Sequence, residues 1–92
     1  MFRMWGKIFK NNRLLKDMVV ENPDPNMTRT LKVYGALEEM CYAFDLEKPL
    51  WLENTKQDFL YHSKARFTKD NFIEEIDFDY LEIEMIEEDY VY

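Results

Sequence analysis

Four carboxylates in the last quarter of the chain have a spacing that could hold a metal ion: Asp77, Asp79, Glu82 and Glu84. Residues two apart on a β-strand point to the same side, so these acids would form two neighbouring pairs. Paired carboxylate oxygens are ligands for Mg²⁺ or Ca²⁺ and could serve a metal-dependent hydrolase. However, the segment contains no lysine and lacks the central glycine of an EF-hand loop. We therefore expect a solvated acidic strand and no metal site, and we keep the hydrolase as the weakest alternative.

His62 and Cys41 are the remaining residues with reactive chemistry, and each is the only one of its type. A catalytic histidine needs a positioned nucleophile and an orienting acid, but its neighbours Tyr61 and Ser63 point to different sides of a helix. Cys41 lies in an apolar stripe, with no cation one turn away to lower its pKa. A single cysteine also offers no ligand pair for zinc. We expect neither an enzyme nor a bound cofactor.

Aromatic side chains make up 16% of the chain, which exceeds what a small core obviously needs. Tryptophan and tyrosine are the favoured anchors of protein interfaces, although they can equally fill a core. From these residues and the acidic segment we predict six partner-binding residues: Trp5, Tyr80, Glu82, Glu84, Tyr90 and Tyr92.

Charge is sorted along the chain. Residues 1–20 carry five basic side chains and one acid, whereas residues 74–92 carry nine acids and no base. The net charge of −7 disfavours nonspecific binding to nucleic acid or to an anionic membrane. The acidic segment could instead imitate phosphates and occupy a basic nucleic-acid-binding groove of another protein. We keep this acidic decoy as the alternative function.

The sequence shows no targeting or membrane segment. No apolar run follows the first ten residues, and no stretch approaches the roughly 20 apolar residues that span a bilayer. The single cysteine fits a reducing compartment. We expect a cytoplasmic protein that contacts a protein partner or a copy of itself, with no direct contact to nucleic acid or membrane.

Strands near both ends must position the candidate residues. Residues 2–10 and 14–21 flank Asn11 and Asn12, which tolerate the left-handed backbone of a tight turn, so the pattern predicts a β-hairpin. Residues 77–87 predict a last strand, because apolar residues alternate with glutamates along its second half. The basic hairpin and the acidic strand would be stabilised side by side by about 0.2–1 kcal/mol per opposite pair.

Two helices are predicted between these strands. Residues 27–44 place apolar side chains at three- and four-residue spacing, and we expect Gly35 within this helix to permit close approach to the sheet. The second helix is predicted roughly over residues 55–66, with Phe67 continuing its apolar stripe.

The predicted fold is a single α+β domain over residues 1–92, in the order β-β-α-α-β. Its two layers are one sheet, made of the N-terminal hairpin and the C-terminal strand, and two helices packed on one face of that sheet. The function that we predict for this small acidic protein is a non-catalytic protein-binding or self-associating module.

Overall fold

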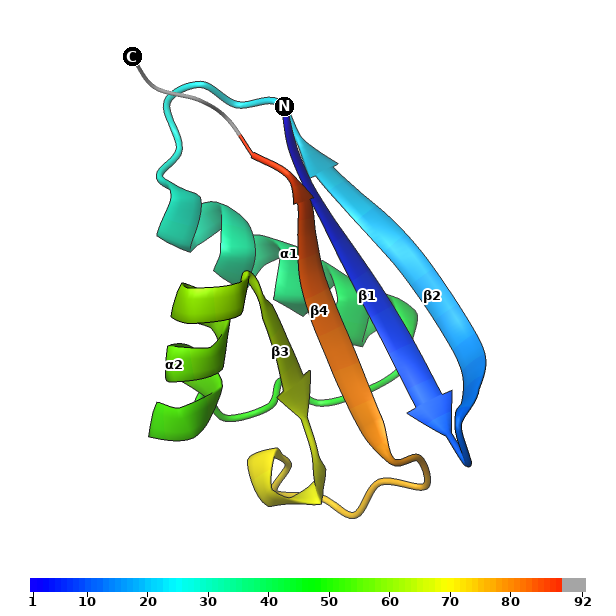
Figure 1. Cartoon of the computed structure of the whole chain (residues 1–92). Coiled ribbons are helices and arrows are strands. Elements are labelled where there is room, and N and C mark those ends of the chain that lie inside the picture. The colour runs from blue at the N-terminus through cyan, green and yellow to red at the C-terminus, as the bar shows by residue number, and fades with distance from the viewer. Residues whose placement is uncertain (89–92) are drawn as a thin grey trace.

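A computed structural model describes residues 1–88 of the chain. The elements are β1 (Phe2–Lys10), β2 (Arg13–Asn22), α1 (Arg29–Ala43), α2 (Glu53–His62), β3 (Lys64–Phe67), the 3-10 turn η1 (Lys69–Asn71) and β4 (Tyr80–Glu87). The strands form one antiparallel sheet in the order β2-β1-β4-β3. Both helices pack on the same face of this sheet (Figure 1). The predicted two-layer α+β fold is confirmed.

The N-terminal hairpin turns at the two asparagines, as the sequence predicted. Asn11 and Asn12 have φ angles of 53° and 63°, in the left-handed region that a two-residue hairpin turn requires. The backbone N–H of Asn11 also donates to Asp79 Oδ2 at 2.8 Å. The hairpin register shifts at Leu15, which has no partner residue on β1. This bulge lies on β2, close to the turn.

The sheet contains one strand more than the sequence predicted. Helix α2 ends at His62 because Ser63 adopts a left-handed conformation, with φ 53°, and its N–H donates to the Phe59 carbonyl at 2.9 Å. The chain then reverses, and β3 pairs with β4. The predicted end of this helix near residue 66 is therefore wrong, and residues 64–67 belong to the sheet.

Helix α1 begins after Thr28, whose side chain accepts a hydrogen bond from the Leu31 N–H at 3.2 Å and so caps the helix. Its buried residues pack on the sheet, together with Phe59 of α2. Within residues 1–88, neither helix combines the length and apolar character needed to cross a membrane.

The two glycines have different surroundings. A Cβ added to Gly6 on β1 would overlap the Met40 side chain, so the glycine leaves room for this side chain of helix α1 against the strand. At Gly35, by contrast, an added Cβ would meet nothing within 4 Å. The close approach predicted at Gly35 is therefore wrong, and Gly6 provides it instead.

Candidate functional site

Four of the six predicted partner-binding residues come together on one face of the sheet. They are Trp5 on β1 and Tyr80, Glu82 and Glu84 on β4. Strands β1 and β4 are antiparallel neighbours, and Trp5 lies opposite Glu84. Both helices cover the other face, so we call this one the open face (Figure 1). The predicted residues Tyr90 and Tyr92 lie outside the described residues.

The acids of β4 are paired with basic residues on both neighbouring strands. From β1, Lys7 Nζ lies 3.0 Å from Glu82 Oε1 and 3.4 Å from Glu84 Oε1. From β3, Arg66 Nε lies 2.9 Å from Glu82 Oε2, and Lys64 Nζ lies 3.2 Å from Glu84 Oε1. The basic hairpin and the acidic strand are therefore neighbours, as the sorted charge predicted. Each of the two glutamates contacts two cations of its own chain.

The centre of this network is withdrawn from water. Lys7 is 7% exposed and Glu82 is 4% exposed, whereas the side chains of Arg66 and Lys64 are 59% and 47% exposed. Burial raises the pKa of Glu82, but hydrogen bonds from Arg66 and Lys7 outweigh burial and hold this pKa below its ordinary value. Glu82 is therefore ionised at neutral pH and acts as a fixed counter-charge.

The aromatic side chains of the open face are engaged in the same network. The indole Nε1 of Trp5 donates to Asp17 Oδ2 at 2.9 Å, and Lys7 Nζ lies 4.0 Å from the Trp5 ring centroid. Similarly, Arg66 Cζ lies 4.5 Å from the Tyr80 ring centroid. These are cation–π contacts, which stabilise both partners and cover part of each ring.

The four carboxylates that could have held a metal ion do not form one group. Asp77 and Asp79 precede β4, which begins at Tyr80, and Asp79 binds the hairpin turn through Asn11. Glu82 and Glu84 lie on the strand and contact lysine and arginine. Among residues 1–88, no three His, Cys, Asp or Glu side chains are placed to hold a metal ion together.

His62 and Cys41 lie in unrelated environments. His62 is exposed at the last residue of α2. Cys41 is a free, buried cysteine on α1, and burial raises its thiol pKa to about 11, partly opposed by the charge of Lys48. A thiol with this pKa is almost fully protonated at neutral pH and is a poor nucleophile.

Strand β2 is an outer strand of the sheet, with β1 on one side and no described strand on the other. Three large apolar residues along it, Leu14, Leu15 and Val19, are between 40% and 52% exposed. The apolar surface continues inward, because Val19 lies opposite Trp5 on β1. The sequence analysis predicted the hairpin but did not identify these residues of β2, since only the strand order shows that they lie at an edge. The other edge strand, β3, is four residues long.

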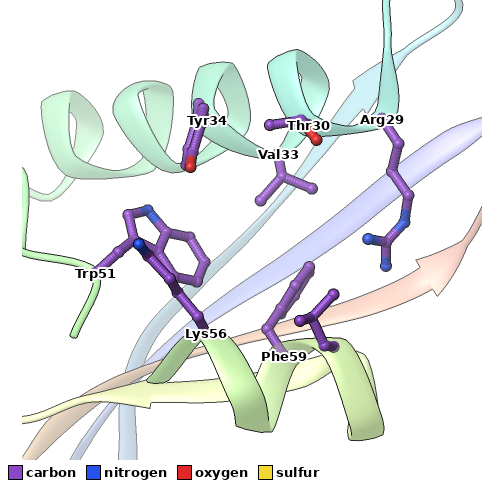
Figure 2. A pocket seen from close by; sticks show the side chains of 8 residues that line it. Arg29, Thr30, Val33, Tyr34, Trp51, Lys56 and Phe59 are labelled. Carbon is purple, nitrogen blue, oxygen red and sulfur yellow. The ribbon is translucent and has the colours of Figure 1, made fainter. Parts of the chain in front are cut away.

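A second candidate feature is a groove of about 180 Å³ between α1 and α2. Val33, Trp51 and Phe59 supply its apolar surface, and Arg29 and Lys56 lie toward opposite ends (Figure 2). The Trp51 ring packs edge-on against Phe59, with centroids 5.8 Å apart. The sequence analysis missed this site because its residues come from two helices and a connecting loop, and only the packing brings them together.

No protein-family model, curated protein or solved structure matches the chain.

Proposed function

We propose that the protein is a non-catalytic binding module that associates with a second copy of itself through strand β2. The observation that carries this proposal is the combination of an outer strand with three exposed apolar side chains, Leu14, Leu15 and Val19. An outer strand presents unpaired backbone N–H and C=O groups, which another strand can extend by main-chain hydrogen bonds.

The charges of β2 favour a second copy as its partner. Arg13 and Lys16 lie in the first half of the strand, Asp17 lies at its middle, and Glu21 lies in the second half. In an antiparallel pair of two β2 strands, the basic half of each copy faces the acidic half of the other. Such an interface has two-fold symmetry and closes on itself, which favours a dimer over an open fibre. Trp5 lies next to Val19 and is the predicted residue that we retain as a direct contact.

We prefer this function to the acidic decoy because Glu82 and Glu84 are already paired with Lys7, Lys64 and Arg66. A basic partner would have to displace these contacts before it could use either carboxylate. The same contacts argue against direct binding of nucleic acid, since the cations of the open face are neutralised. We further propose the cytoplasm as the compartment, because a free cysteine thiol fits a reducing environment.

The oligomeric state tests the proposal. We expect the wild-type chain to sediment as a dimer at micromolar concentration in analytical ultracentrifugation. The double variant Leu15→Lys with Val19→Lys should be a monomer, because it places four like charges at the paired edge of the two copies. It should still unfold cooperatively, since both side chains are exposed in the single chain, but at a lower melting temperature than the dimer, because association stabilises the folded state.

The control variant is Tyr61→Lys. Tyr61 is 78% exposed on α2, which packs beside β3 at the opposite side of the sheet from β2 (Figure 1), so this substitution removes exposed apolar surface without changing β2. It should leave the dimer intact. A monomeric wild type, or a double variant that remains a dimer, would refute association through β2.

A further inference from the structure

The groove between α1 and α2 has an apolar centre and a cation toward each end (Figure 2). Val33 and Phe59 are buried at its base, and Trp51 is half-buried at one side. Since apolar side chains dominate the lining, water in the groove finds few hydrogen-bonding partners and is readily displaced by a hydrocarbon.

The two cations differ in what they contact. Arg29 forms an ion pair with Glu88, and its guanidinium carbon lies 5.3 Å from the Phe59 ring centroid. This contact shows that a carboxylate is accommodated at the Arg29 end of the groove. Lys56, at the end beside Trp51, forms no ion pair with any acid of residues 1–88. Its charge is available to an anionic ligand.

We propose that this groove binds a small amphipathic carboxylate, with its hydrocarbon body between Val33, Trp51 and Phe59 and its carboxylate on Lys56. The proposal is independent of association through β2, because the groove and the strand edge are separate surfaces. The charge of Lys56 selects an anion, and the apolar centre selects a hydrocarbon, so neither an uncharged alcohol nor a short acid such as acetate satisfies both.

The volume of the groove limits the size of the ligand. The groove is open to solvent on one side and has a volume of about 180 Å³, which is the scale of a short hydrocarbon chain. We take octanoate, with six methylenes and a methyl group, as the central probe of a chain-length series. Each methylene that is buried in the groove should raise the affinity about fourfold, and the gain should level off once the chain extends past the apolar lining.

The probes for the experiment are butyrate, hexanoate, octanoate and decanoate, with octan-1-ol as the uncharged comparison. The chain contains two tryptophans, Trp5 on the open face and Trp51 in the groove, so two indole N–H signals are expected in an NMR spectrum. A Trp5→Phe variant assigns them. We expect octanoate to shift the Trp51 signal saturably while the Trp5 signal stays in place.

The decisive variant is Lys56→Met, which keeps an unbranched side chain and removes the charge. We expect it to weaken octanoate binding about fivefold, because a partly exposed ion pair contributes about that factor to an affinity. Binding of octan-1-ol should be unchanged. Lys10→Met is the control, because Lys10 is exposed at the end of β1 and away from the groove. It should alter neither affinity.

Lys56 is exposed, so the Lys56→Met variant should unfold at the wild-type temperature, and a melting curve checks this. The proposal is overturned if octanoate leaves the Trp51 signal unmoved. It is equally overturned if Lys56→Met binds octanoate as tightly as the wild type, because the groove would then select only for hydrocarbon.

Discussion

On the covered face of the sheet, Leu81 and Ile83 of β4 are fully buried against the helices. On the open face, Glu82 of the same strand is almost as inaccessible, at 4% exposed. The two apolar side chains are stabilised by removal of hydrocarbon from water. Glu82 would be destabilised by the same removal, and instead depends on Lys7 and Arg66 for its stability. Burial therefore stabilises the apolar side chains and destabilises the neighbouring carboxylate, although all three are buried to a similar extent. Mutations on the two faces can measure these two effects separately.

The largest effect should come from the covered face. We expect Ile83→Ala to reduce the free energy of unfolding by about 2–5 kcal/mol, because it removes a buried side chain and leaves a cavity. Urea denaturation followed by circular dichroism measures this loss. The control is Ile86→Ala on the same strand, where the side chain is 41% exposed and the loss should stay below about 1 kcal/mol. Equal losses at both positions would contradict the assigned faces of β4.

A smaller loss is expected on the open face. Glu82→Gln keeps the shape of the side chain but removes the charge that both Lys7 and Arg66 contact, and we expect a loss of about 1.5–3 kcal/mol. Lys64→Met should cost less than about 1 kcal/mol, since Lys64 is an exposed partner. The same urea experiment compares them.

The double variant Lys7→Met with Glu82→Leu sharpens the comparison between the faces. It replaces the central ion pair by apolar groups, so neither charge is left buried alone. We expect it to be more stable than Glu82→Gln. If the double variant is instead the less stable of the two, the ion pair contributes more than its burial costs.

The charge of Glu82 should also give the stability a pH dependence. Because the folded-state pKa of Glu82 lies below the ordinary value of 4.5, its contribution to stability is present above that value and is lost as pH falls through the folded-state pKa. The wild type and Glu82→Gln should therefore differ in stability at neutral pH and converge in acid. Unfolding at several pH values between neutral and about 3 measures the difference. A constant difference would contradict the lowered pKa.

The sequence predicted the hairpin, both helices and the last strand because each has a local signal. The asparagine pair specifies the turn, and the alternation of apolar residues with glutamates specifies β4. The opposite charges of the first and last strands predicted that these strands are neighbours. This pairing brings together Trp5, Tyr80, Glu82 and Glu84. Local pattern and charge were therefore enough for most of the fold.

Strand β3 was missed for a definite physical reason. Phe59, Ser63 and Phe67 follow one another at four-residue spacing, which is the spacing of a helix face. The helix is ended by Ser63 in a left-handed conformation, a position where glycine is the usual signal. Because β3 supplies Lys64 and Arg66, the full pairing of Glu82 and Glu84 could not be predicted either.

The position of β1 in the sheet has a consequence for the order in which the protein folds. Its partner β2 follows after a two-residue turn, whereas its other partner β4 lies some seventy residues further along the chain, where Phe9 pairs with Tyr80. Closing a short loop costs less entropy than closing a long one, so the hairpin can form early and β4 must dock late. During synthesis on the ribosome, the β1 edge of the hairpin is therefore unpaired until β4 has emerged, in addition to the β2 edge.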